Sequence, residues 1–132
     1  MQNIAILAGR IGQDPEGNTV DNDTYVARFS LATSRPRYKN GKVVRGKDGY
    51  RVQDTEWHRI TCFNGLGKTV QEYCTKGMSV LVRGRIHYST WTDKDGVERY
   101  STEIIAETVD FLSRAKDAEG AADDRQDDDI PF

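Results

Sequence analysis

The stretch YVARFSLAT, residues 25–33, decides the fold because its larger side chains recur at every second position. Tyr25, Phe29 and Leu31 fall on one side of this alternation, and Arg28 and Ser30 fall on the other. A period of two is that of a β-strand, whereas a helix repeats every 3.6 residues. We therefore predict a strand with one face in a hydrophobic core.

The same kind of pattern recurs along the chain. In residues 56–63, Trp57, Arg59, Thr61 and Phe63 share one face of a predicted strand. Turn-forming pairs such as Gly17-Asn18, Asn40-Gly41 and Asp95-Gly96 separate the apolar segments. One helix is predicted over 66–76, where apolar residues recur at helical spacing between glycines. The predicted strands cover residues 4–9, 25–33, 56–63, 79–87 and 100–109.

A single short helix between the third and fourth of five strands is typical of an all-β OB-fold, a five-stranded Greek-key barrel. The chain has 132 residues, which suits one compact domain and a tail. Residues 1–112 are the predicted barrel domain. From residue 113 the apolar content falls, so we predict a disordered linker over 113–126 and an acidic tip over 127–132.

The net charge of -2 conceals two unlike segments. Residues 1–112 hold 16 Lys and Arg against 14 Asp and Glu, a net +2, whereas residues 113–132 hold 3 against 7, a net -4. The acidic tail therefore hides a barrel whose charge suits an anionic partner.

Several classes of protein are disfavoured. The apolar runs are far shorter than the roughly 20 residues of a membrane-spanning helix, and residues 1–9 lack the features of a secretion signal. We expect no membrane association and a cytoplasmic location. Cys62 and Cys74 are expected to be reduced thiols, and with His58 and His87 they lack metal-ligand spacing. No phosphate-binding loop or catalytic grouping is present, so we expect no cofactor, no metal and no enzymatic activity.

A basic segment lies between residues 34 and 54, and we call it the basic arm. Its cations can neutralise phosphates while Tyr38 and Tyr50 stack on bases. The alternative is a solvated loop whose charges prevent edge-to-edge aggregation. We expect a mobile arm that contacts nucleic acid through Tyr38 and its cations, Arg35, Arg37, Lys39, Lys42, Arg45, Lys47 and Arg51.

Trp57, Phe63 and Trp91 are either core residues or stacking platforms. The tryptophans have polar neighbours rather than the apolar flanks of a buried run, although a tryptophan in a strand is more often part of the core. The residue pattern alone leaves both interpretations open.

The sequence resembles the bacterial and phage single-stranded DNA-binding proteins, whose motifs it carries in order across nearly the whole chain. These are IGQDPE at 11–16, LATS at 31–34, TEWHR at 55–59, YCTKG at 73–77, WTD at 91–93 and DDDIPF at 127–132. The resemblance implies sequence-independent binding of single-stranded DNA in replication, recombination and repair, in the nucleoid or in the host cytoplasm if a phage encodes the chain.

The resemblance also implies roles for single residues. Trp57, Phe63 and Trp91 fall on positions that stack on bases, and His58 falls on a subunit-interface position. The first strand, with Ile4 and Ile6, resembles the one that pairs two subunits, and two such dimers form the family's usual homotetramer.

The chain departs from the family pattern next to the arm. Where the family commonly has a further stacking tryptophan, this chain has Arg37, and either Tyr38 or Tyr50 could replace the missing ring. We expect the lengthened basic arm to compensate.

The terminal residues place an apolar end on an acidic run. The apolar end can fill a pocket on another protein, basic groups there can hold the carboxylate, and the aspartates can steer the encounter. A metal site is disfavoured because consecutive aspartates in an unfolded segment lack fixed geometry. We predict that the tip recruits replication and repair proteins through Asp127, Asp128, Asp129, Ile130, Pro131 and Phe132.

The sequence is also compatible with two other functions. The barrel could be a protein-interaction module in which Trp57 and Trp91 anchor an interface. It could also bind RNA, or single strands with a base preference.

Overall fold

The computed structural model describes residues 1–113. It contains one α-helix and two sheets, of which the larger has the strand order β1-β7-β8-β6-β3-β2. The elements are β1 (Ala5–Ile11), β2 (Glu16–Val20), β3 (Thr24–Pro36), β4 (Tyr38–Lys39), β5 (Lys42–Val43), β6 (Gln53–Phe63), α1 (Asn64–Tyr73), β7 (Ser79–Thr92) and β8 (Glu98–Phe111).

The large sheet closes into a barrel where β1 pairs with β3 at Arg10↔Ala32 and Ile11↔Leu31. This closure requires a residue without a side chain, because a Cβ on Gly9 would overlap the carbonyl oxygen of Ala32. β6 and β8 are parallel and the other pairs are antiparallel, with α1 between β6 and β7 in the chain. The predicted all-β OB-fold is confirmed.

The core lies inside the barrel and under α1. Its fully buried members include Leu31, Ile60, Val82 and Met78, and α1 contributes Val70. The alternation predicted for residues 25–33 holds, since Phe29 and Leu31 are buried while Arg28 is exposed.

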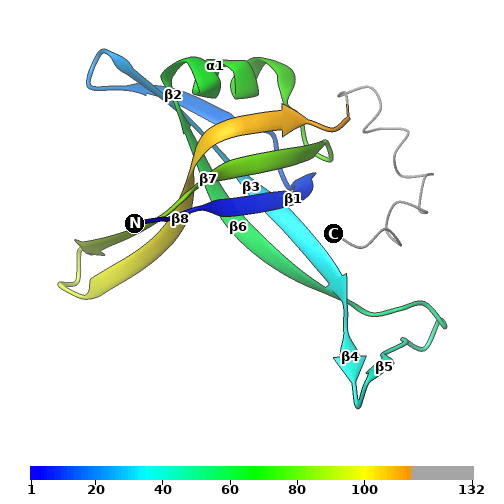
Figure 1. Cartoon of the computed structure of the whole chain (residues 1–132). Helices are drawn as coiled ribbons and strands as arrows, with labels where there is room; N and C mark the ends of the chain where they lie inside the picture. Colours follow the sequence, from blue (N-terminus) through cyan, green and yellow to red (C-terminus); the bar gives the residue numbers. More distant parts are fainter. Residues whose placement is uncertain (114–132) are drawn as a thin grey trace.

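Two long strand pairs extend beyond the barrel in different directions, as Figure 1 shows. One is the β7–β8 hairpin, which ends in the turn at residues 93–97. The other is formed by β3 and β6, which carry the basic arm with its small β4–β5 sheet at their far end (Figure 1). The predicted connection therefore contains secondary structure of its own.

β3 and β6 are longer than the strands predicted over 25–33 and 56–63. Apart from these extensions, the main differences from the sequence-based predictions are four. Gly17-Asn18 is not a turn but part of β2; the turn follows at Asp21 and Asn22, which have positive φ values of 50° and 66°. Glycine is needed at position 17 because a Cβ there would collide with the hydroxyl group of Tyr25. Three short strands, β2, β4 and β5, add to the five predicted ones.

The other two differences concern the ends of elements. α1 ends at Tyr73 rather than at residue 76, because the chain is extended at Cys74 and Gly77 N–H then donates to the carbonyl of Ile11 in β1. β7 continues past the predicted residue 87 to Thr92, since its partner β8 starts as early as Glu98.

Candidate nucleic-acid interface

Trp57 and Phe63 lie on the outward face of β6. This face alternates with an inward one on which His58 is half-buried and Ile60 and Cys62 are buried. Side chains of residues that are paired across two strands point to the same side of the sheet, so the pairing shows which residues of the neighbouring strands lie on this outward face. Within β6 the face continues through Arg59.

Trp91 belongs to the same face. Thr61 Oγ1 donates a hydrogen bond of 3.0 Å to Glu103 Oε2, which joins the outward side of β6 to that of β8. Glu103 is paired with His87, and four residue pairs further along the ladder, an even number and so on the same side, Trp91 is paired with Arg99. The three aromatic rings are accessible: Trp57 is 63% exposed, Trp91 52% and Phe63 39%.

Four exposed arginines share this face, and the sequence analysis did not identify them. Arg28 pairs with Thr61, Arg85 with Ile105, and Arg99 with Trp91, while Arg59 follows Trp57 at the next outward position. Along the sequence Arg28, Arg85 and Arg99 are isolated charges, and only the strand register places them on the face of the aromatic rings. Arg59 shares the face of Trp57 and Phe63 already in the alternation of residues 56–63. The face therefore combines stacking surfaces with cations, although two carboxylates also lie there: Glu103, and Asp93, which is paired with Arg99.

The indole of Trp57 rests on a position without a side chain. A Cβ on Gly12 would overlap Cζ3 of Trp57 and would lie 3.1 Å from its Cη2 and 2.8 Å from Ser30 Oγ. Gly12 N–H also donates to the carbonyl of Ser30 at 2.8 Å. One part of the ring is thus supported by backbone while the exposed remainder can contact a ligand.

Trp91 stands next to a well-braced turn. The carboxylate of Asp93 accepts hydrogen bonds from the backbone N–H groups of Asp95 and Val97, both 2.9 Å long, and from Arg99 Nε at 2.9 Å. The Val97 N–H first, and then Arg99, lower the pKa of Asp93. These contacts fix the hairpin end that carries Trp91.

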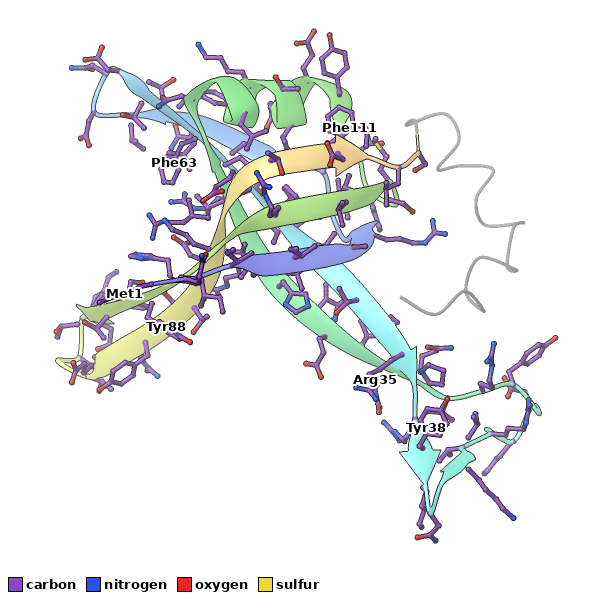
Figure 2. All side chains as sticks on the ribbon, in the orientation of Figure 1. Met1, Arg35, Tyr38, Phe63, Tyr88 and Phe111 are labelled. Carbon is purple, nitrogen blue, oxygen red and sulfur yellow. The ribbon has the colours of Figure 1, made fainter. Side chains whose placement is uncertain are left out.

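The basic arm is a separate surface at the far end of β3 and β6. Figure 2 shows Arg35 and Tyr38 at its base, at the opposite end of the sheet from Phe63. Tyr38 and Tyr50 are exposed. Of the predicted cations, Arg51 is half-buried, and the exposed ones are Arg35, Arg37, Lys39, Lys42, Arg45 and Lys47.

The guanidinium of Arg37 is paired with a carboxylate of β6. Its Nε donates to Asp54 Oδ1 at 2.8 Å and its Nη2 lies 2.7 Å from the same oxygen. The hydrogen bond and the charge of Asp54 raise the pKa of Arg37. The pair borders a groove of about 540 Å³ at the base of the arm.

Two further exposed tyrosines lie on the β7–β8 hairpin. Tyr88 pairs with Thr102, and Tyr100 with Thr90, so both tyrosines are on the face opposite to Trp91. Tyr100 nevertheless lines one groove of about 330 Å³ with Trp57, because β6 and β8 pair only at residues 60–61 and 104–105 and residues of both faces border the gap beyond that pairing. The predicted strand ended at residue 87, so Tyr88 was not assigned to a face of β7.

Of the predicted subunit-interface residues, Ile6 lies on β1, Ile4 directly precedes that strand, and His58 lies on β6. Ile4 and Ile6 are exposed. His58 Nε2 and Thr33 Oγ1 share a hydrogen bond of 2.8 Å. β1 pairs with β7 over residues 5–10 but with β3 only at Arg10 and Ile11. Within residues 1–113, no strand pairs with the other edge of residues 5–9.

Cys62 and Cys74 are free and buried, and burial raises the pKa of Cys62 to about 12 and that of Cys74 to about 11. Residues 1–113 contain no cluster of potential metal ligands and no helix long and apolar enough to cross a membrane. The predicted linker from 114 on, and the tip over 127–132, lie outside the described residues.

Comparison with known proteins gives a consistent set of similarities. Residues 2–112 match the model of the single-strand binding protein family. The chain is 38% identical over 110 residues to a single-stranded DNA-binding protein of Xanthomonas axonopodis pv. citri, covering 83% of this chain and 57% of that protein. It is 36% identical over 120 residues to one of Neisseria meningitidis, covering 91% of this chain and 65% of that protein. The chain thus spans less than two thirds of the length of these relatives.

A solved structure is similar throughout the barrel. It is described as a Plasmodium falciparum SSB complex with single-stranded DNA and superposes with a TM-score of 0.73 at 27% sequence identity. The match covers 86% of this chain and 96% of that one.

Proposed function

The chain belongs to the single-strand binding protein family, and we propose that it binds single-stranded DNA without strong sequence preference and performs no reaction on it. The observation that carries this proposal is the joint placement of Trp57, Phe63 and Trp91 on one exposed face with four arginines. Every base has a π-face, so stacking on such rings tolerates any sequence, while the cations follow the phosphates.

Tryptophan fluorescence tests this proposal. Trp57 and Trp91 are the only tryptophans of the chain, so stacking of a short oligo-dT should quench most of the emission. Single Trp57→Phe and Trp91→Phe variants assign the quenching to each ring, and duplex DNA is the control for purely electrostatic binding. No quenching at low salt would refute the proposal.

The basic arm supplies further phosphate contacts in this proposal. Replacing Arg45, Lys47 and Arg51 together with glutamine should weaken binding and flatten its salt dependence. For single strands each lost phosphate contact removes about 0.7 from the slope of log K against log salt, so three remove about 2. Lys68→Gln with Lys76→Gln, at α1 and the turn after it, is the control, and an equal slope in wild type and arm variant contradicts the role of the arm.

We extend the proposal to self-assembly. The unpaired edge of β1, with Ile4 and Ile6 exposed beside it, can add a strand of a second copy, and a homotetramer then forms from two dimers. His58 is the third proposed interface residue. Light scattering should give a tetramer for the wild type and a smaller species for Ile6→Asp, with exposed Val97→Asp on the hairpin turn as the control. An unchanged mass for Ile6→Asp excludes this edge.

The tip at 127–132 is proposed to recruit proteins of replication, recombination and repair. The support is its composition, three aspartates followed by the apolar residues Ile130, Pro131 and Phe132. Deleting Phe132 should abolish retention of such proteins while leaving the affinity for oligo-dT unchanged, with Gln126→Ala as the control. Retention unaffected by the deletion would contradict this role.

A further inference from the structure

The tip of the basic arm is a two-residue turn made by Asn40 and Gly41. Both residues have positive φ values, 54° and 79°, as the type I′ turn of a two-residue hairpin requires. The turn joins β4 to β5, and Lys39 is paired with Lys42 directly across it. One further residue pair completes this small sheet, so its tip can open at little cost in free energy.

Glycine follows asparagine at two places in the chain, at 40–41 and at 64–65. All four residues are exposed, so exposure does not distinguish the two places. Asn64 and Gly65 begin α1, and Asn64 Oδ1 accepts a hydrogen bond of 3.2 Å from Tyr25 N–H. Within residues 1–113 the side-chain amide of Asn40 has no hydrogen-bond partner. The structure therefore holds Asn64 more firmly than Asn40.

An asparagine followed by glycine can react with its own backbone. The glycine nitrogen loses its proton and forms a bond to the asparagine Cγ, the bond from Cγ to the side-chain nitrogen breaks, and ammonia leaves. Water then opens the cyclic imide at one of its two carbonyl groups and yields aspartate or isoaspartate. No oxidant or metal is needed. A Cβ at Gly41 would have no neighbour within 4 Å, so the surroundings do not shield the attacking nitrogen.

Two features of the arm favour this reaction at Asn40. Ring closure requires the asparagine backbone to rotate out of its turn, which a short hairpin permits at lower cost than the first turn of a ten-residue helix. Lys39 and Lys42 are paired, so their side chains lie on one side of the hairpin and bring positive charge near the anionic intermediate. At Asn64 the helix and the Tyr25 hydrogen bond oppose the same rotation.

We propose that Asn40 and Gly41 form a site of spontaneous deamidation, and that the product lowers the affinity of the basic arm for a DNA strand. The reaction puts a carboxylate between two lysines of the arm, and isoaspartate also lengthens the backbone of the turn by one methylene group. The effect on affinity rests on the proposed binding of single-stranded DNA, whereas the reaction does not. An ageing population of the protein loses contacts of the arm while the rings on the barrel face are unaffected.

Peptide mapping by mass spectrometry of the folded full-length protein, sampled over days in mildly alkaline buffer, tests the reaction. Deamidation at Asn40 should be at least about 10-fold faster than at Asn64, because the start of the helix must first open. In denaturant the two rates should become similar. Asn40→Gln is the matched control, since its longer side chain must close a larger ring. Equal rates in the folded protein, or an unchanged ratio of rates in denaturant, overturn the proposed site.

The variant Asn40→Asp reproduces the charge of the product and tests its effect on binding. The affinity for oligo-dT should fall roughly 2- to 5-fold, as expected for one exposed charge pair, and the salt slope should fall by up to about 0.7. Gln71→Glu, the same amide-to-acid change at an exposed position of α1, is the control. Wild-type tryptophan quenching serves as the reference: its absence refutes DNA binding itself, whereas quenching with an Asn40→Asp affinity equal to the wild type refutes only the effect of deamidation on the arm.

Discussion

Replacing Gly12 with alanine adds one methyl group directly beneath the indole of Trp57. Gly12 does not have a positive φ, so the substitution causes no backbone strain, and the new Cβ conflicts with Cζ3 of Trp57 and Ser30 Oγ. We expect the ring to tilt off its support. In single-strand-binding proteins generally, a stacking contact is worth roughly 1–3 kcal/mol per base, so losing it weakens binding by about 5- to 150-fold. Because the tilted ring keeps part of this contact, Gly12→Ala should weaken binding by a factor near the lower end of that range.

A double-mutant cycle isolates this effect from any general destabilisation. Phenylalanine at position 57 lacks the Cζ3 and Cη2 atoms that meet the new methyl group, so Gly12→Ala should cost little in a Trp57→Phe background. The affinities are measured by anisotropy of a labelled oligo-dT, and the salt slope should be the same in all four proteins. Gly65→Ala, where a Cβ has no neighbour within 4 Å, is the control. If Gly12→Ala weakens binding equally in both backgrounds, the support of Trp57 by Gly12 is refuted.

Three other predictions follow from the described contacts. Cys62 and Cys74, with pKa values raised to about 12 and about 11, should stay protonated at pH 8 and react slowly with iodoacetamide unless the protein is unfolded; fast alkylation of the native protein contradicts this. Hydrogen bonds to the Asp93 carboxylate lower its pKa in the folded protein. The ionised carboxylate therefore stabilises the fold above the unfolded-state pKa of about 3.9, and this contribution is lost as the pH falls through the lowered pKa of the folded protein. Thermal melts of Asp93→Asn should therefore depend less on pH in that window than those of the wild type, and parallel curves would contradict it. Arg59→Gln should lower the salt slope of DNA binding by about 0.7, and no change would remove Arg59 from the interface.

The barrel strands were predictable because alternation in residues 25–33 and 56–63 is a local signal that the core then reinforces. The turn predicted at Gly17-Asn18 was wrong because the glycine makes room for the hydroxyl group of Tyr25, which lies across the β2–β3 hairpin. Sequence pattern cannot distinguish a glycine that permits a turn from one that makes room for a ring.

The candidate site was predictable in its residue types but not in its arrangement. The stacking rings came from a resemblance, whereas Arg28, Arg85 and Arg99 join them only through the strand register. The Arg37–Asp54 pair likewise joins residues on different elements, and from the sequence Arg37 is one arm cation among several. Pairing between strands that are far apart in the sequence decides which charges lie beside which rings, and a short stretch of sequence does not contain that information.

The basic arm is closed by its own short-range bonds. Gly46 N–H donates to Tyr50, Gly49 N–H to Gly46, and Val52 N–H to Val44, while the Arg45↔Arg51 bridge lies at its centre. None of these contacts involves a core residue of the barrel. Substitutions, insertions and changes of charge in the arm can therefore accumulate without a penalty in folding. If the arm binds the DNA strand as proposed, its affinity for the strand can change independently of the stability of the barrel.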